Sequence, residues 1–198
     1  MSTPLDQLKS VDLSHLSKDE AKEFTILLEE LEKREKRESS MASFYDFVKA
    51  IWPEFIAGAH HKKMAEAFDK IASGESKRLI INMPPRHTKS EFASYLFPAY
   101  LLGKRPKLKI IEATHTADLA INFGRRVRDL LESEEYAEIF PATELKADSR
   151  SAGKWNTSQG GQYYAAGIGG ALAGRGADLF IIDDPHSEQD AFSDKALE

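Results

Sequence analysis

The chain has 198 residues, of which 41% are hydrophobic and 30% are charged, and its net charge is −5 at pH 7. This length accommodates one full-sized domain with a buried core, in the composition range of soluble globular proteins. The absence of cysteine excludes a disulfide framework and a cysteine-based zinc site. No apolar run approaches the roughly 20 residues that span a bilayer, and the N-terminus lacks the features of a signal peptide, so we expect a cytosolic protein.

The negative net charge conceals an uneven distribution along the chain. Residues 60–130 carry 14 basic and 7 acidic side chains, whereas residues 131–198 carry 5 basic and 13 acidic ones. Local charge sets the attraction for phosphate, so the basic block 60–130 is a candidate nucleic-acid surface. A set of ordinary solvated surface charges is the alternative.

Residues 1–54 are predicted to form an N-terminal arm and helical region. Residues 1–16 are polar and weakly patterned, which is typical of a mobile arm. Ser17 and Glu20 fit the S-x-x-E capping box that opens a helix over 17–38. A second helix is expected over 44–51, before Trp52-Pro53.

From residue 55 onward, strands are predicted to alternate with helices. Apolar runs predict buried strands at 78–83, 107–113 and 177–183, with a further strand at 163–166 inside a glycine-rich loop. Helical periodicity predicts helices at 60–71, 89–102 and 116–131. This alternation indicates an α/β fold whose central, mostly parallel sheet is flanked by helices.

The loop between the first predicted strand and the next helix has features of a phosphate-binding loop. Such a loop offers backbone N–H groups and a helix N-terminus to an anion. Lys89 and Ser90 match the end of the G-x-x-x-x-G-K-[ST] pattern, whereas Met83 and Thr88 stand at its glycine positions. Lys89 would reach the β- and γ-phosphates of ATP, and Ser90 would give its hydroxyl to Mg²⁺. An ordinary strand-to-helix turn is the alternative.

The other residues of this loop complete the predicted cradle. They are Pro85, Arg86, His87 and Thr88. Arg86 would stabilise the transferred negative charge, which makes it a candidate catalytic residue.

The strand predicted at 177–183 ends in two carboxylates, in the arrangement of a Walker B motif. Four apolar residues lead into Asp183 and Asp184. Asp183 would bind Mg²⁺, and Asp184 would polarise the attacking water. A strand capped by a common Asp-Asp-Pro turn is the alternative. Both motifs are expected at strand ends of one parallel sheet, where such sites form.

Taken together, the motifs resemble the large terminase subunit of tailed bacteriophages, the DNA-packaging ATPase. The resemblance covers about residues 55–198, in the family's order. It is carried by residues 79–91 (LIINMPPRHTKSE), 113–120 (ATHTADLA), 169–178 (GGALAGRGAD) and 181–185 (IIDDP).

This resemblance implies an ASCE-type P-loop NTPase fold, with ATP and Mg²⁺ as cofactors. The family works as a homo-oligomeric ring on a procapsid, with the portal protein, the small terminase subunit and double-stranded DNA as partners. It acts in the host bacterial cytoplasm and transiently at the portal vertex. Arg175 matches the place of an arginine finger that reaches a neighbour's ATP. The segment 55–61 lies where the family grips adenine.

Several points stay open at the level of the sequence. Arg125, Arg126 and Arg128 are rivals for the finger and could instead contact DNA phosphates. By the resemblance, 55–198 would be an ATPase domain that is incomplete at its C-terminus, and the family's nuclease domain would be absent from this chain. The alternatives are a superfamily 2 helicase-like ATPase and a non-enzymatic docking fragment of the terminase.

Overall fold

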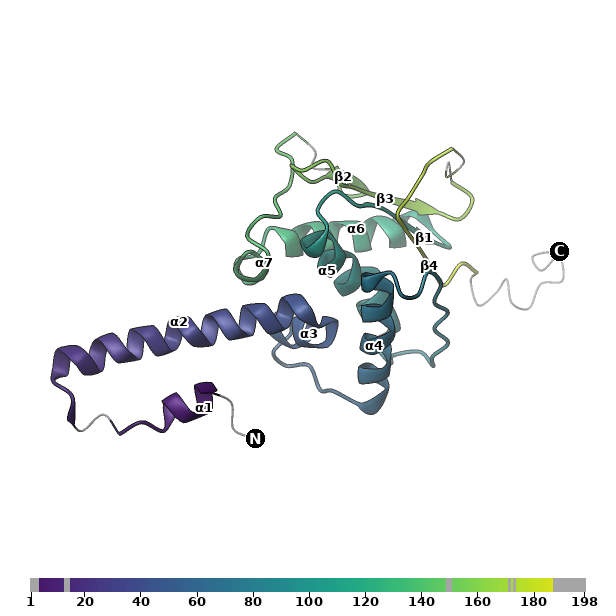
Figure 1. Ribbon diagram of the computed structural model, residues 1–198. Helices are drawn as coiled ribbons and strands as arrows, with labels where there is room; N and C mark the ends of the chain where they lie inside the picture. Colours follow the sequence, from purple (N-terminus) through teal and green to yellow (C-terminus); the bar gives the residue numbers. More distant parts are fainter. Residues whose placement is uncertain (1–3, 13–14, 149–150, 171, 173, 187–198) are drawn as a thin grey trace.

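The computed structural model describes residues 4–12, 15–148, 151–170, 172 and 174–186. Figure 1 shows the long helix α2 extending away from the α/β portion of the molecule, with α1 beside it. The helices are α1 (Pro4–Lys9), α2 (Lys18–Ala42), α3 (Phe44–Ile51), α4 (Ala59–Ser73), the π-helix η2 (Glu91–Leu96), α5 (Phe97–Lys104), α6 (Ala117–Leu131) and α7 (Glu134–Ile139). The strands are β1 (Lys109–Thr114), β2 (Lys154–Asn156), β3 (Gln162–Gly167) and β4 (Leu179–Asp183).

The capping box predicted at Ser17 is present at the start of α2. The Glu20 amide donates to the Ser17 hydroxyl at 3.3 Å, and the Ser17 amide donates to the Glu20 carboxylate at 2.9 Å. The N-terminal segment, expected to be an arm, contains the short helix α1. An ion pair of 2.8 Å between Lys9 and Glu32 ties α1 to α2.

The sheet has four strands in the order β2-β3-β1-β4. The strand β1 pairs in parallel with β3 and β4, and β2 pairs antiparallel with β3. The mostly parallel sheet predicted from the sequence is therefore confirmed, although β2 was not expected. Thr114 aligns with Gly167 on one side and Asp183 on the other, so three strands end along the same edge.

The prediction of a strand at 78–83 is wrong. In the structure this segment has no regular secondary structure and pairs with no strand of the described sheet, and the Ile80 side chain is 86% exposed. A cavity of about 380 Å³ separates residues 77–81 from β4, lined by apolar side chains of both. The apolar run thus faces the free edge of the sheet across a gap instead of joining the hydrogen-bond ladder.

The helices η2, α5 and α6 pack together, and η2 and α6 cover one face of the sheet. Trp155 and Tyr163 stack there, at a ring distance of 4.9 Å, and the Trp155 indole donates to the Gly124 carbonyl of α6 at 3.0 Å. A Cβ at Gly124 would approach the Ala152 carbonyl to 2.7 Å, so only glycine permits this close packing. On the opposite face, Phe180 and Ile182 of β4 are about half exposed.

The hydrophobic core joins the predicted N-terminal region to the α/β portion. Phe44 of α3 is fully buried, and its ring lies 5.2–5.5 Å from those of Phe68, Phe92, Phe97 and Tyr100. Residues before and after position 54 therefore share one core. Truncating such a ring typically costs about 3–5 kcal/mol.

The helix predicted at 89–102 begins at Lys89 and continues to Lys104, but its first part is irregular. Residues 91–96 form the π-helix η2, and regular α-helix follows from Phe97. π-Helical turns are rare and often occur at functional sites. Among the described residues, no helix is long and apolar enough to cross a bilayer.

Candidate phosphate-binding site

Lys89 and the two carboxylates at the end of β4 lie together, as the sequence predicted. The Lys89 ammonium lies 3.1 Å from Oδ1 of Asp183 and also donates to Asp184. Burial by itself lowers the pKa of Lys89, but the hydrogen bonds and charges of Asp184 and Asp183 outweigh it and raise that pKa. The Asp183 side chain is 5% exposed and that of Asp184 is 64% exposed. One carboxylate is therefore enclosed, and the other faces solvent.

Unusual backbone conformations concentrate at this site. Arg86, Thr88 and Asp184 have φ angles of +63°, +62° and +43°. They are the only residues other than glycine with positive φ in the described part of the chain. Such conformations cost roughly 1–3 kcal/mol each and cluster where function requires a particular backbone. The loop thus adopts left-handed conformations without the glycines of the usual pattern.

His61 supports the conformation of the loop through a contact with Thr88. The Gly58 amide donates to Nδ1 of His61 at 2.8 Å, so the proton of the neutral ring is on Nε2. This Nε2 lies 2.7 Å from Oγ1 of Thr88, and Thr88 donates in turn to the His87 carbonyl at 2.6 Å. Burial, followed by the neighbouring His60 and His87, lowers the pKa of His61 and favours this neutral form.

The segment 55–61 packs directly against the loop and its helix. The Phe55 ring lies 4.7 Å from that of His61 and 5.5 Å from that of Phe92. The His60 ring lies 3.8 Å from that of His61, tilted by 42°, and 5.8 Å from that of His87. The segment expected near adenine is therefore adjacent to the candidate phosphate-binding loop, and its contact with a base stays a prediction.

Ser94 of η2 orients the enclosed carboxylate of Asp183. The Ser94 hydroxyl donates to Oδ2 of Asp183 at 3.1 Å, which leaves Oδ1 facing Lys89. No group of three or more His, Cys, Asp or Glu side chains among the described residues could hold a metal alone. Mg²⁺ bound with a nucleotide needs only one or two carboxylates besides phosphate oxygens and waters. Asp183, with the Ser90 hydroxyl at the start of the helix, fits that requirement.

The remaining predicted loop residues are placed at the surface. Pro85, Arg86 and His87 are exposed, and the His87 ring hydrogen-bonds the Pro85 carbonyl at 2.8 Å. The Arg175 guanidinium stacks 3.9 Å over the Tyr164 ring of β3. Tyr164 lies two strands from β4, about 10 Å at ordinary strand spacing. The structure therefore holds Arg175 apart from the Lys89 ion pair.

The three arginines of α6 have different environments. Arg126 makes a two-pronged ion pair with Glu91 at 2.9 and 2.5 Å and stacks 4.2 Å over Tyr95. The hydrogen bond to Glu91 raises the pKa of Arg126 further. Arg128 pairs with Asp129 at 2.7 Å, whereas the Arg125 side chain is exposed. Arg126 thus joins α6 to η2, and Arg125 faces solvent.

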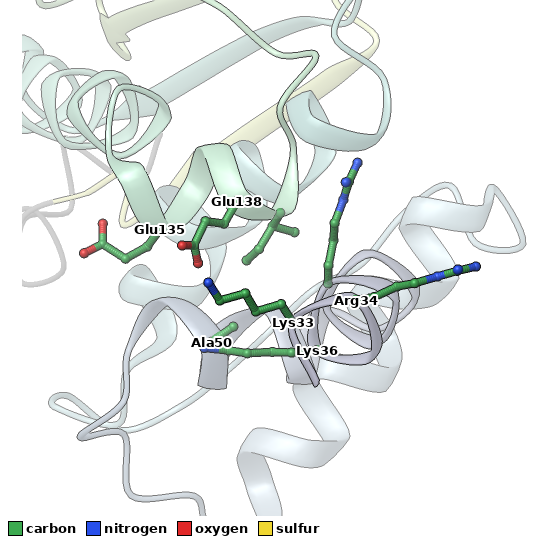
Figure 2. Close-up of a pocket in the computed structure, with 8 residues that line it drawn as sticks. Lys33, Arg34, Lys36, Ala50, Glu135 and Glu138 are labelled. Atoms are coloured by element: carbon green, nitrogen blue, oxygen red, sulfur yellow. The ribbon is translucent and has the colours of Figure 1, made fainter. Parts of the chain in front are cut away.

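Two cavities differ in their relation to this site. The cavity beside β4 is lined by Lys89 and Asp183, among others. A second, of about 430 Å³, lies between α2 and α7. Figure 2 shows charged side chains of both signs around it, with Lys33 of α2 directed toward Glu138 of α7. The second cavity contains none of the predicted site residues.

Sequence reasoning missed three residues that support the site. His61 was expected near adenine or as part of a helix start, not in contact with Thr88, and Ser94 and Glu112 were not considered. Glu112 carried a detectable signal, because it is a charged residue inside the apolar run that forms β1. The hydroxyl of Ser94 offered none, since its direction depends on the π-helical turn.

Comparisons with known proteins add no further information on the site. The chain matches no family model, no curated protein and no solved structure. The assignment of a function consequently depends on the geometry and on the sequence motifs.

Proposed function

We propose that this chain is an ATPase that binds ATP at the loop 85–90 and transfers its γ-phosphate to water. The observation that carries the proposal is the ion pair between Lys89, at the start of a helix, and Asp183, at the end of a parallel strand. Left-handed backbone at Arg86, Thr88 and Asp184 accompanies it. This combination of a cation, carboxylates and strained loops suits phosphoryl transfer, in which positioning and charge stabilisation supply most of the catalysis.

Each residue then has a defined task. Lys89 leaves the exposed Asp184 and binds the β- and γ-phosphates as a point charge. The released Asp184 orients the attacking water from the solvent side. Ser90 and Asp183 would hold Mg²⁺, which would neutralise part of the phosphate charge. Arg86 contributes a further positive charge from the exposed loop.

We further propose that hydrolysis drives packaging of double-stranded DNA into a procapsid. The support is the order of motifs shared with large terminase subunits and the basic block 60–130. Many side chains of this block are exposed, among them Lys62, Lys63, Lys77, Arg78, Lys107, Lys109 and Arg125. In this proposal the partners are the portal protein, the small terminase subunit and neighbouring copies in a ring. Arg175 is the residue we assign to reach a neighbour's ATP.

One observation favours a second candidate, a docking fragment that binds no nucleotide. The Lys89 charge is already neutralised by two carboxylates, and Met83 and Thr88 replace the glycines of the usual loop. In this case the Lys89 cluster would be a structural ion pair, and the basic surface alone would mediate binding.

Calorimetric titration with Mg²⁺ and ATP separates the two candidates. The proposed ATPase binds the nucleotide, and Lys89→Ala weakens binding about 10- to 100-fold, since a charged hydrogen bond contributes roughly 1.5–3 kcal/mol. Lys9→Ala is the matched control, because Lys9-Ser10 is another Lys-Ser pair of this chain and lies outside the site. Absence of binding by the unaltered chain would contradict the ATPase and favour the docking fragment.

A further inference from the structure

Glu112 is a charged residue type in the interior of the sheet. It lies at the centre of β1 and its side chain is 0% exposed. Neither carboxyl oxygen has a hydrogen-bond partner within the described part of the chain. Burial raises the pKa of Glu112 well above its usual value; the nearby Ser94 hydroxyl acts in the opposite direction, and the charge of Asp183 adds to the rise. Full burial without a hydrogen-bond partner in the described structure therefore favours the neutral carboxylic acid over the charged carboxylate.

A neutral carboxylic acid has one hydrogen to donate, and the Ser94 hydroxyl oxygen is a nearby acceptor. Register places Glu112 beside Ile181, on the same face of the sheet as Asp183. Ser94 of η2 packs on this face, close to Glu112. Its single hydroxyl hydrogen goes to Oδ2 of Asp183, so its oxygen is left with lone pairs that can accept.

The second buried group on this face is Tyr163 of β3. Its hydroxyl also has no partner among the described residues. Burial raises the pKa of Tyr163 well above its usual value. Tyr163 is thus a neutral donor in the same interior, suited to the carbonyl oxygen of Glu112. Ser94, Asp183 and Tyr163 are the groups that contact or influence Glu112 from the elements packed around it.

We infer that Glu112 is a positioning residue for Asp183. It donates its hydrogen to the Ser94 oxygen, and Ser94 donates to Oδ2 of Asp183, so that Oδ1 stays directed at Lys89. Consecutive hydrogen bonds in a dry interior polarise and strengthen one another. This inference rests on the proposed function for its consequence, because a fixed Oδ1 matters for catalysis only if Asp183 holds Mg²⁺.

Three variants test the consequence through the Mg²⁺ concentration that gives half-maximal ATP hydrolysis. Glu112→Gln keeps the size and a donor, so its Mg²⁺ requirement stays close to that of the unaltered chain. Glu112→Leu and Ser94→Ala break the connection and raise the requirement about 10- to 100-fold, as removal of outer-shell partners usually does. We expect Glu112→Leu to fold, because it replaces a buried polar group that has no hydrogen-bond partner within the described ranges by an apolar side chain of similar size. A normal Mg²⁺ requirement in Glu112→Leu, or equal impairment of Glu112→Gln, would overturn the inference.

Infrared difference spectroscopy tests the connection without nucleotide. The spectrum of the unaltered chain minus Glu112→Gln should contain the C=O band of a protonated carboxylic acid at neutral pH. Ser94→Ala should move this band to higher frequency, because the acid loses its acceptor. A carboxylate signal, or a band insensitive to Ser94→Ala, would overturn the inference. If the C=O band is present and shifts in Ser94→Ala as expected, but the unaltered chain hydrolyses no ATP, only the proposed function fails.

Discussion

Nε2 of His61 lies 2.7 Å from Oγ1 of Thr88, and this contact joins the first turn of α4 to the candidate phosphate-binding loop. Thr88 has a φ of +62°, a conformation that costs a non-glycine residue roughly 1–2 kcal/mol. The hydrogen bonds from His61 to Thr88 and from Thr88 to the His87 carbonyl offset that cost. The chain therefore fixes by side-chain contacts a conformation that other loops obtain from glycine.

Removal of the His61 ring should destabilise the protein and the loop together. His61→Ala leaves the Gly58 amide and the Thr88 hydroxyl without this partner and opens a cavity, at a cost of about 2–3 kcal/mol. His61→Gln keeps a donor toward Thr88 and should recover part of the loss. Urea unfolding measures both variants, with the exposed His15→Ala as the control. Equal stability of His61→Ala and the unaltered chain would contradict the assigned role.

The same histidine should make stability depend on pH. The pKa of His61 is lowered in the folded protein and ordinary, about 6.5, in the unfolded chain. Below pH 6.5 the unfolded state binds more protons, so His61 stabilises the fold above that pH, and this contribution is lost toward the lowered pKa. The slope from this one group is at most about 1.4 kcal/mol per pH unit. Unfolding between pH 7.5 and 5.5 should therefore be less pH-sensitive in His61→Gln, and identical slopes would refute this.

Arg126 should act in stability rather than in catalysis. Its two-pronged ion pair with Glu91 is about one-third exposed, so we expect Arg126→Ala to cost about 1–2 kcal/mol. Replacement of the neighbouring exposed Arg125 by alanine should change the free energy of unfolding by about 0.5 kcal/mol or less. Denaturant titrations and ATP hydrolysis are measured for both. An Arg126→Ala variant of normal stability without hydrolysis would instead identify Arg126 as the finger.

Binding of double-stranded DNA should weaken steeply with salt. Each phosphate contact contributes about −0.9 to the slope of log affinity against log salt concentration. Arg125→Ala should reduce the magnitude of that slope by about one if Arg125 contacts a phosphate. Fluorescence anisotropy with duplexes of unrelated sequence measures the slope. A response that is flat with salt would contradict contact between the basic block and DNA.

Local sequence signals predicted much of the fold. The capping box at Ser17 and the apolar periodicity located α2, α3, α4 and α6 to within a few residues. Apolar runs located β1, β3 and β4, because parallel strands that are buried on both faces consist of nearly uninterrupted hydrophobic residues. The three-residue strand β2 left no comparable pattern, since its formation depends on pairing with β3.

The predicted strand at 78–83 shows what composition does not specify. An apolar run indicates burial, but a strand also needs a neighbour that completes its hydrogen bonds. In the structure the nearest edge, β4, lies across a cavity, and Ile80 stays exposed.

Of the candidate site, the sequence predicted only the residues that are proposed to contact the nucleotide and Mg²⁺. Lys89, Asp183 and Asp184 follow local motifs, and the sheet brings them together as expected. His61 contacts the loop at Thr88 and Ser94 contacts Asp183, so both contacts depend on packing that the sequence does not display.

The rate of ATP hydrolysis tests the central claim most directly. The unaltered chain, Lys89→Ala, Asp184→Ala and the control Lys9→Ala are assayed with excess Mg²⁺ in the presence of DNA. We predict turnover by the unaltered chain and Lys9→Ala, and losses of about 100-fold or more in the other two, as expected for groups that act on the transition state. Turnover unchanged by both Lys89→Ala and Asp184→Ala would contradict the assignment of this site.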